Sequence, residues 1–475
     1  MKLSQLIDGI DIIQIYNEAD VEITGVHYNS KEIKPGNLFV AIEGFVTDGH
    51  KYIPSAAQAG AAAVIAQRYT EGVDIPQIIV GDSRIAEARV CSTFFGNPSH
   101  KFKLIGITGT NGKTTCTYLV KHILESAGKK TGLIGTNQNM IGDRVIETGR
   151  TTPDAFELQQ LFAQMAEENV DCVIMEVSSH SLELSRVHGC RFEVGAFTNL
   201  TQDHLDFHVT MENYAAAKEK LFSMCEAAVI NTDDKFGEAM AERASCRTLT
   251  YGRNDDCSLR AENVELRENG VSFTLGGTHF SLPIPGDFSV YNALCAIGIA
   301  SAMGISAEET ALYLAGAAGV KGRAEVVKTD TDYTVMIDYA HTPDGIENIL
   351  KTVRGFAKGR VVILFGCGGD RDNTKRPVMG ELAGRLADFC IITSDNPRSE
   401  EPMSIISMIE PAVKATGTPY VVIENRREAI EYALRNARKD DVIVLAGKGH
   451  ETYQILSTGT IHFDEREVIH DILAK

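Results

Sequence analysis

The sequence predicts an α/β protein built from three domains, and three observations lead to this prediction. The chain has 475 residues, about three times the usual size of one domain. From residue 103 onward, short apolar segments alternate with helical ones, which is typical of parallel sheets covered by helices on both faces. A glycine-rich turn at residues 107–115 joins one apolar segment to a helix, as in phosphate-binding domains. We expect domains at residues 1–100, 101–322 and 323–475.

The first domain is predicted to mix short strands with an alanine-rich helix at Pro54–Ala59. The expected strands are Val21–His27, Asn37–Ala41, Ala63–Ala66 and Gln77–Val80. Turn-forming residues at 97–100 are expected to link this domain to the next.

The other two domains are predicted to repeat a strand–helix alternation. The expected strands are Leu104–Thr108, Thr131–Ile134, Cys172–Val177, Val194–Thr198, Ala228–Ile230, Thr334–Asp338, Val361–Phe365, Phe389–Thr393, Tyr420–Ile423 and Val442–Leu445. The clearest helices are Cys116–Ser126 and Tyr291–Ala302. Val264–Leu275 and His279–Leu282 flank two glycines, which predicts a β-hairpin insertion.

Charge and cysteine content narrow the functional class. The formal net charge of −18 disfavours nonspecific binding to nucleic acid or to an anionic membrane. The ten cysteines form no C-x-x-C pair, so we expect reduced thiols rather than disulfides. Asp8 and Asp11 interrupt the first apolar stretch, and no run approaches the roughly 20 apolar residues that cross a bilayer. We therefore expect a cytoplasmic protein without nucleic acid or membrane insertion. A monomer that acts on small molecules is a further expectation.

Residues 107–115, Ile-Thr-Gly-Thr-Asn-Gly-Lys-Thr-Thr, are predicted to hold a polyphosphate. The two glycines allow backbone N–H groups to point at phosphate oxygens at a helix N-terminus. Lys113 can reach the β and γ oxygens, and the hydroxyl of Thr114 or Thr115 can ligate Mg²⁺. The first glycine of the Walker pattern would fall at Ile107, so the loop is a variant. The alternative is an ordinary strand–turn–helix joint.

Two polar segments that follow strands are candidates for holding a metal ion. Glu176 ends an apolar strand, where ligands of open α/β sheets bind, and could hold Mg²⁺ beside the phosphates. An edge carboxylate without a ligand is the alternative. His204 and His208 lie four residues apart among aspartates, so they could bind a metal or simply share a polar helix face. Lys218 lies in an alanine-rich helix and has no signal of its own.

Taken together, these motifs resemble the Mur ligases, ATP-dependent enzymes that extend the peptide of the bacterial cell-wall precursor. The shared segments cover nearly the whole chain. They are 30–41, 108–115, 176–180, 198–208, 338–343, 368–372, 395–398 and 447–451. The resemblance implies a central P-loop-type, parallel-sheet ATPase domain between a small α/β domain that binds the UDP sugar and a Rossmann-like C-terminal domain that binds the amino acid.

The resemblance also implies site residues, position by position. ATP would be held by Gly109, Thr110, Asn111, Gly112, Lys113, Thr114, Thr115, Asn292, Arg323 and Asp338. The acceptor, UDP-N-acetylmuramoyl-L-alanyl-D-glutamate, would contact Ser30, Thr151, Thr152, Ser178 and Arg186. Mg²⁺ would be bound by Thr114, Glu176, His204 and Lys218. Lys218 would be N-carboxylated, and Lys113, His204 and Lys218 would be the catalytic residues. The amino acid would be held by Arg371, Asp395, Asn396, Pro397, Arg398, Gly447 and Glu451.

The implied reaction is the formation of an amide through an acyl phosphate, in peptidoglycan precursor synthesis. Residue chemistry favours meso-2,6-diaminopimelate over L-lysine, because the planar guanidinium of Arg398 can pair with the extra carboxylate. Asp395 and Glu451 could accept hydrogen bonds from the neighbouring ammonium group. The alternatives are a loop-capping role for Arg398, a lysine-adding ligase, a folylpolyglutamate synthase-like ligase and a catalytically silent nucleotide-binding regulator.

Four positions depart from the family pattern. Asn29 and Lys31 replace the Asp and Arg that often flank the N-terminal serine. Leu184 stands where some relatives have Gln, and Val209 replaces the usual Gly after the second histidine. Each departure puts a local substrate contact in question but leaves the implied reaction unchanged.

Overall fold

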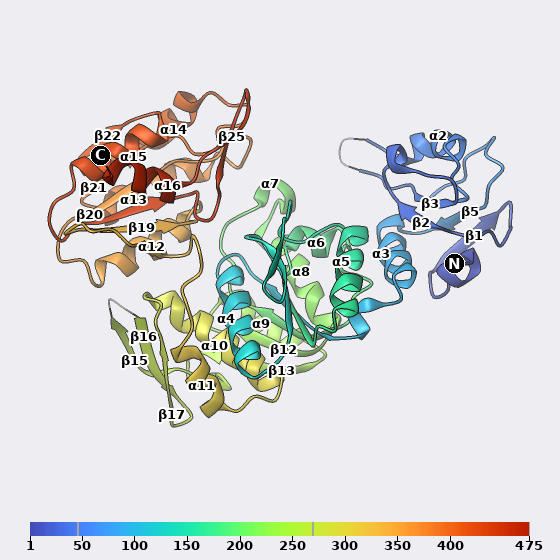
Figure 1. The fold of residues 1–475 in the computed structure, drawn as a ribbon, viewed down its shortest axis with the longest axis horizontal. Helices are drawn as coiled ribbons and strands as arrows, with labels where there is room; N and C mark the ends of the chain where they lie inside the picture. Colours follow the sequence, from blue (N-terminus) through green and yellow to red (C-terminus); the bar gives the residue numbers. More distant parts are fainter. Residues whose placement is uncertain (45–46, 268–269, 475) are drawn as a thin grey trace.

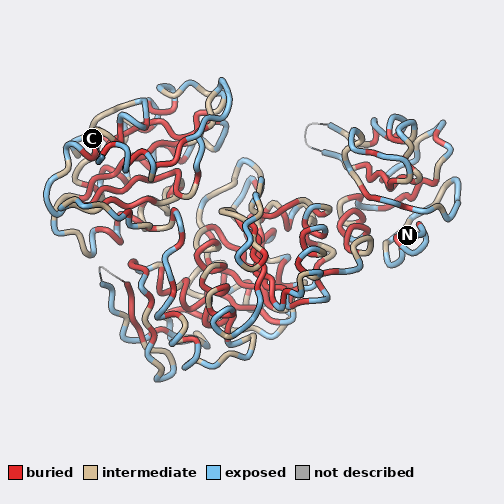
Figure 2. Tube along the Cα trace, viewed as in Figure 1, coloured by how far each residue is buried: buried red, intermediate tan, exposed pale blue. Residues whose placement is uncertain are grey.

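The computed structural model describes residues 1–44, 47–267 and 270–474. Its main sheets follow the chain order, and the central one lies between an N-terminal and a C-terminal body (Figure 1). Buried residues gather along the central strands of each body, and exposed residues are found mainly in loops and at sheet edges (Figure 2). Within the described ranges, no helix has the length and apolar content needed to cross a bilayer.

The N-terminal sheet has five strands in the order β1-β5-β4-β3-β2, parallel except for β1. The strands are β1 Ile12–Tyr16, β2 Gly25–His27, β3 Asn37–Val40, β4 Ala63–Ala66 and β5 Gln77–Val80. The helices are α1 Leu3–Leu6, α2 Ile53–Gln58 and α3 Ser83–Phe94. The predicted strand Val21–His27 was too long, because Val21 to Thr24 lie outside the ladder. β1 and α3 were not predicted.

The central sheet has nine strands in the order β14-β13-β12-β11-β6-β10-β7-β8-β9. They are β6 Lys103–Thr108, β7 Thr131–Ile134, β8 Asn139–Ile141, β9 Arg144–Ile146, β10 Cys172–Glu176, β11 Phe192–Phe197, β12 Cys225–Asn231, β13 Arg247–Gly252 and β14 Leu259–Arg260. All pairs from β14 to β7 are parallel, whereas β8 and β9 are antiparallel additions.

Helices cover both faces of this sheet, as the continuous apolar strands predicted. Ile105 packs with α4 (Lys113–Ser126) and α10 (Asp287–Ala302) in one core. The next residue back, Leu104, packs with α5 (Ala155–Glu167) in a separate core on the other face. The parallel strands therefore end at one edge, which carries the phosphate-binding loop after β6 and Glu176 at the end of β10.

An antiparallel sheet of three strands is inserted between β14 and α10. It contains β15 Glu262–Arg267, β16 Gly270–Leu275 and β17 Thr278–Leu282. The prediction of a hairpin here was correct for β16 and β17. It was wrong in treating Val264–Leu275 as one strand, because two antiparallel strands occupy this segment. The break between them, residues 268–269, lies outside the described residues.

The C-terminal sheet has six strands in the order β18-β19-β23-β20-β21-β22, parallel except for β18. They are β18 Glu325–Val327, β19 Thr334–Asp338, β20 Val361–Phe365, β21 Phe389–Ile392, β22 Tyr420–Val422 and β23 Val442–Ala446. One face is covered by α12 Pro343–Arg354, α13 Lys375–Leu386 and α14 Pro402–Ala415, and the other by α15 Arg426–Arg435 and α16 Glu465–Leu473. The hairpin β24 Tyr453–Leu456 and β25 Gly459–His462 follows β23. This doubly covered, mostly parallel sheet agrees with the Rossmann-like prediction.

Candidate functional site

The phosphate-binding loop has the backbone that the sequence predicted. Gly112 precedes α4 with φ +85°, and a Cβ there would lie 2.5 Å from Asn292 Oδ1. A Cβ on Gly109 would lie 1.8 Å from Thr198 Oγ1, so neither glycine can be replaced without displacing its neighbour. No side chain caps the N-terminus of α4, which leaves its N–H groups available to an anion.

Lys113 is folded over this loop. Its ammonium donates to the carbonyl oxygens of Gly109 at 2.9 Å and Thr110 at 2.8 Å. Burial lowers the pKa of Lys113, while the nearby Glu176 acts in the opposite direction. The loop thus concentrates positive charge and N–H donors, the combination that a polyphosphate requires.

Glu176 is buried and lies beside the loop. Its Oε1 accepts hydrogen bonds from Thr114 Oγ1 and from the N–H of Thr136, both at 2.9 Å. The hydroxyl of Thr136 donates to Oε2 at 2.9 Å and lies 3.0 Å from the hydroxyl of Thr151. Thr136, which follows β7, was missed at the sequence level because a single threonine after a strand has no distinctive pattern. A carboxylate beside two hydroxyl groups is a suitable set of oxygen ligands for Mg²⁺.

His204 and His208 do not form a common metal site. His204 precedes α7 (Leu205–His208) with φ +53°, and burial lowers its pKa to about 3, so its imidazole is neutral and able to ligate a metal. His208 is buried, pairs with Ser179 Oγ at 2.9 Å and stacks on Tyr214. The idea that both histidines bind one metal was therefore wrong, as was the idea of a shared polar helix face. The described ranges contain no group of three or more His, Cys, Asp or Glu side chains suited to a metal.

Lys218, on α8 (Met211–Glu219), is almost completely buried, with 1% of its surface exposed. Its amine donates to Gly109 O at 2.8 Å and lies 4.4 Å from the centre of the Tyr214 ring. Burial, reinforced by Lys113, holds its pKa well below the usual value. The amine lies at the same carbonyl oxygen as Lys113.

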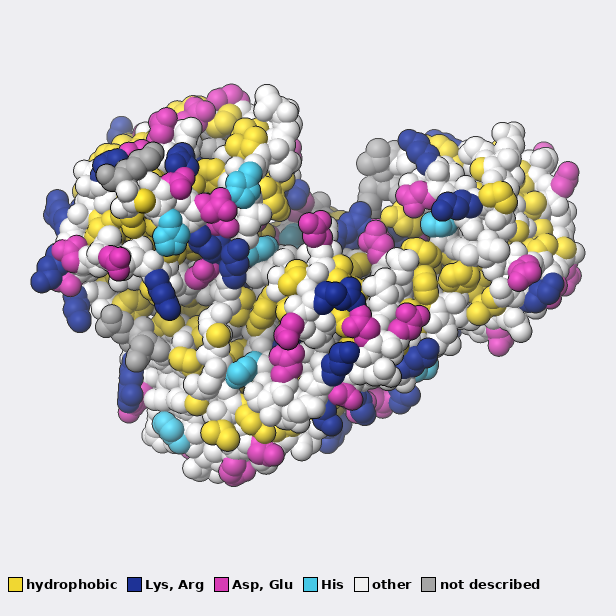
Figure 3. Space-filling model, viewed as in Figure 1, with side chains coloured by type: hydrophobic (Ala, Val, Ile, Leu, Met, Phe, Trp, Pro, Cys, Tyr) yellow, Lys and Arg dark blue, Asp and Glu magenta, His cyan; other side chains and the backbone are white. Residues whose placement is uncertain are grey.

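A cavity of about 610 Å³ lies between the central and C-terminal bodies. Its lining includes seven of the ten residues predicted to bind ATP, namely Asn111, Gly112, Thr114, Thr115, Asn292, Arg323 and Asp338, but not Gly109, Thr110 or Lys113. Arg323 donates to Thr114 Oγ1 at 3.1 Å, and Asn111 Nδ2 donates to Asp344 Oδ2 at 2.5 Å. In Figure 3, the surface between the C-terminal and N-terminal bodies is hollowed down to the central one.

Four of the five residues predicted to contact the acceptor form one cluster. Thr152 Oγ1 donates to Glu176 O at 2.9 Å and accepts from Ser178 N at 3.1 Å. Arg186 donates to Thr152 O at 3.1 Å, while Thr151 reaches Glu176 through Thr136. Ser30, in the N-terminal body, has no hydrogen bond to the other four within the described ranges.

Asp154 holds this cluster to the N-terminal body. Its carboxylate accepts from Arg186 Nε at 2.9 Å and from the hydroxyl of Tyr28 at 3.0 Å, and it also pairs with Arg150. Asp154 was not predicted from the sequence, where an Asp before a helix indicates only a helix cap.

The residues predicted to hold the amino acid follow β20, β21 and β23, three neighbouring strands of the sheet. Asn396 Nδ2 donates to Glu451 Oε2 at 2.9 Å, and a Cβ on Gly447 would lie 2.6 Å from Asp395 Oδ2. Arg398 has φ +54° and donates to Gly369 O at 2.8 Å, so it also holds a loop.

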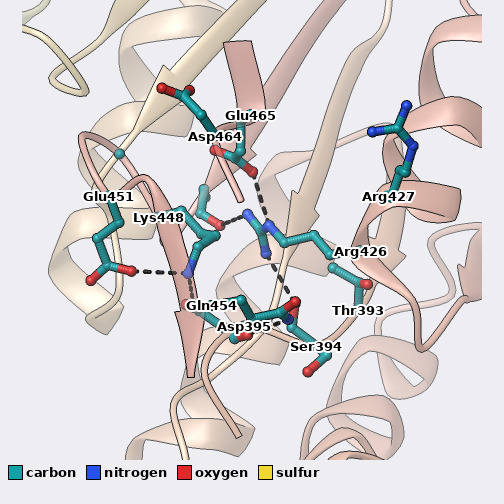
Figure 4. Close-up of polar contacts among 12 residues, drawn as sticks. Thr393, Ser394, Asp395, Arg426, Arg427, Lys448, Glu451, Gln454, Asp464 and Glu465 are labelled. Carbon is teal, nitrogen blue, oxygen red and sulfur yellow. Dashed lines mark hydrogen bonds and ion pairs between the residues drawn. The ribbon is translucent and has the colours of Figure 1, made fainter. Parts of the chain in front are cut away.

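Two further residues of this predicted set lie near Arg398. Arg371 is exposed and contacts Asp370 O at 3.2 Å. A Cβ on Gly369 would lie 1.9 Å from Pro397 O, so the two loops are in close contact. Lys448, at the centre of the site in Figure 4, was not predicted to take part.

Comparison with known proteins agrees with this architecture. Residues 107–300 match the Mur ligase middle domain, 322–449 the Mur ligase glutamate ligase domain, and 22–90 the catalytic domain of the Mur ligase family. The chain is 52% identical to UDP-N-acetylmuramoyl-L-alanyl-D-glutamate--2,6-diaminopimelate ligase of Caldanaerobacter subterraneus subsp. tengcongensis, across 100% of this chain and 99% of that protein. A similarly named protein of Clostridium acetobutylicum is 48% identical, with the same coverage.

Solved structures agree as well. One of a UDP-N-acetylmuramoyl-L-alanyl-D-glutamate--2,6-diaminopimelate ligase superposes with a TM-score of 0.71 at 29% identity, covering 100% of this chain and 99% of that one. MurF from Acinetobacter baumannii superposes with a TM-score of 0.65 at 18% identity, covering 100% and 98%, and shares the fold. On the strength of the three matched domains and the full-length relatives, this chain belongs to the Mur ligase family.

Proposed function

We propose that this protein is an ATP-dependent ligase that adds meso-2,6-diaminopimelate to the D-glutamate of UDP-N-acetylmuramoyl-L-alanyl-D-glutamate. The observation that carries the proposal is the convergence of Lys113 and Lys218 on the carbonyl of Gly109, beside the Thr114–Glu176 pair. This arrangement brings a phosphate-binding loop next to the acceptor cluster that begins at Thr152. The relatives that share the full length of the chain carry the corresponding name.

The first step is the transfer of a phosphoryl group. A carboxylate is a poor electrophile, so an oxygen of the D-glutamate carboxylate attacks the γ-phosphorus of ATP, ADP leaves and an acyl phosphate forms. The loop N–H groups and Lys113 stabilise the negative charge that spreads over the transferring group. Arg323, which contacts Thr114, adds a second fixed positive charge at the same place.

The donor groups beside the loop fit Mg²⁺. Thr114 and Glu176 supply oxygen ligands, His204 a neutral imidazole, and Lys218 a buried amine of lowered pKa that can take up CO₂ to form a carbamate. When bound, Mg²⁺ would neutralise phosphate charge and draw the two anionic substrates together.

The second step forms the amide. The neutral amine of diaminopimelate attacks the carbonyl carbon of the acyl phosphate, the carbon–oxygen bond to phosphate breaks, and a proton leaves the nitrogen. The C-terminal body holds the distant ammonium group, which does not react, through Asp395 and Glu451, and Arg398 pairs with the carboxylate beside it. Residues 1–100, 101–322 and 323–475 serve as the acceptor, nucleotide and amino-acid units of one reaction.

A coupled assay tests the proposal and its specificity. We expect ADP release only when both the acceptor and an amine are present. The value of kcat/KM for diaminopimelate should exceed that for L-lysine by about 10³-fold, because lysine would leave the guanidinium of Arg398 unpaired. Equal use of lysine would overturn the specificity, whereas ADP release with a folate acceptor would overturn the assignment itself.

A further inference from the structure

Lys448 is a fully buried lysine that follows β23 in the amino-acid site, with 0% of its surface exposed. Its ammonium donates to Asn396 Oδ1 and Glu451 Oε2, both at 2.9 Å, and lies 3.4 Å from Asp395 Oδ1. A buried ammonium is strongly unfavourable unless it is paired, so these contacts fix its position. All three partners are residues that we propose to hold the incoming amino acid (Figure 4).

Each carboxylate uses only one of its oxygens on Lys448. Asp395 Oδ2 and Glu451 Oε1 accept no hydrogen bond from any residue that the structure describes. Glycine at 447 leaves Asp395 Oδ2 accessible, since a Cβ there would lie 2.6 Å away. The formal charge of Lys448, Asp395 and Glu451 together is −1. One substrate ammonium would therefore bring the group to neutrality.

A second buried cation holds the backbone independently of Lys448. Arg426 pairs with Glu465 at 2.9 Å, and both side chains are buried. It also donates to Ser394 O at 3.3 Å and to Ala446 O at 2.8 Å. These carbonyls belong to the residues just before Asp395 and just before Gly447. Arg426 thus holds the backbone of both loops in place, and its positive charge is balanced by Glu465.

We propose that Lys448 is a positioning residue of the amino-acid site. It holds one oxygen of Asp395 and one of Glu451, directs the other oxygens toward the substrate and leaves one negative charge for a single ammonium group. The inference rests on the proposed function, because it concerns the second substrate of that reaction. Lys448 has no contact with the phosphate-binding loop among the described residues, so its role is separate from the first step.

Two reactions of the full-length protein distinguish positioning from a general structural role. One is amide formation with diaminopimelate. The other is hydroxamate formation with hydroxylamine, a small neutral nucleophile that traps the acyl phosphate without needing an ammonium site. For Lys448→Met we expect kcat/KM for diaminopimelate to fall about 30-fold or more. Hydroxamate formation should stay within about twofold of wild type, because the phosphate-binding loop is unchanged. Lys414→Met, at an exposed lysine of α14, is the matched control and should leave both reactions unchanged.

Parallel losses in the two reactions would overturn the proposal, as would an unchanged kcat/KM for diaminopimelate. Lys448→Gln keeps hydrogen-bond donors but removes the charge. If the methionine variant does not fold, the two reactions are measured on this variant instead. A selective loss is expected there too, and a loss common to both reactions contradicts the proposal. Wild-type protein that makes no diaminopimelate product would instead refute the proposed function.

Discussion

Val209 is the most strained residue near the candidate site. Its φ of +69° and ψ of −46°, with a hydrogen bond from Thr210 N to His208 O at 2.8 Å, define a γ-turn with positive φ. A β-branched residue is poorly suited to this backbone, and 73% of its side chain is exposed, so little packing offsets the strain. The sequence analysis noted Val209 as a departure from the glycine of the family pattern. It did not predict the backbone conformation of this residue.

Val209→Gly should therefore stabilise the protein. Relief of about 1–3 kcal/mol of backbone strain exceeds the roughly 0.5–1 kcal/mol that glycine loses in conformational entropy. We expect the melting temperature of the central body to rise by about 2–4 °C. Val145→Gly provides the contrast, because Val145 is an exposed strand residue and its replacement should lower the melting temperature. A fall in both variants would show that the γ-turn is not strained.

At Lys218, the buried amine, whose pKa is lowered by burial, predicts dependence on CO₂. Lys218→Ala should lose about 10²-fold or more of the ligase activity, and acetate should restore part of it by replacing the carbamate oxygens. Wild-type turnover should also fall in CO₂-depleted buffer. Lys220→Ala removes an exposed lysine two residues away and serves as the control. Full activity of Lys218→Ala would exclude the role of a carbamate.

At the scale of elements, the sequence predicted the buried strands and missed the marginal ones. The strands β6, β20 and β23 were predicted because each is a short apolar run. Its residues alternate between the two hydrophobic cores on opposite faces of the sheet. β8 and β9 have three residues each and lie at the edge of the sheet, so they have no detectable periodicity.

The residues of the candidate site also fall into those that the sequence predicted and those that it missed. Loop residues such as Lys113 were predicted because their spacing reflects a local geometry. Thr136 gains its role from Glu176, 40 residues away, and Lys448 gains part of its role from Asn396, 52 residues away, which no local pattern can reveal.

The loops after β20 and β21 form one unit, and Gly369 is where they touch. Gly369→Ala would place a Cβ 1.9 Å from Pro397 O and push apart the segments that carry Arg371 and Arg398. We expect KM for diaminopimelate to rise about tenfold, with KM for ATP unchanged, because a misplacement near 1 Å is sufficient for such a loss. Gly81→Ala, where a Cβ meets nothing within 4 Å, should change neither constant. Equal changes in both KM values would indicate global damage instead.

At the scale of the molecule, the hydrogen bond of 2.5 Å between Asn111 and Asp344 joins the phosphate-binding loop to α12 of the C-terminal body. Its loss in Asp344→Ala should favour open arrangements, by up to about tenfold for a bond worth 0.5–1.5 kcal/mol. We expect a larger radius of gyration by small-angle scattering in the absence of substrates. Asp330→Ala, at an exposed loop position, should scatter as wild type does. Unchanged scattering in Asp344→Ala would show that the bond does not restrain the bodies.

The position of β23 has a consequence for biosynthesis. It pairs with β19 on one side and β20 on the other, yet it is the last of the six strands to be translated. Until the ribosome has released residue 446, the halves of the C-terminal sheet have no strand to join them. A nascent chain therefore completes its amino-acid site only after β23 has been made, when the nucleotide site has already had time to fold. Premature termination between α12 and β23 would yield a polypeptide that keeps the residues proposed to bind nucleotide but cannot complete the amino-acid site.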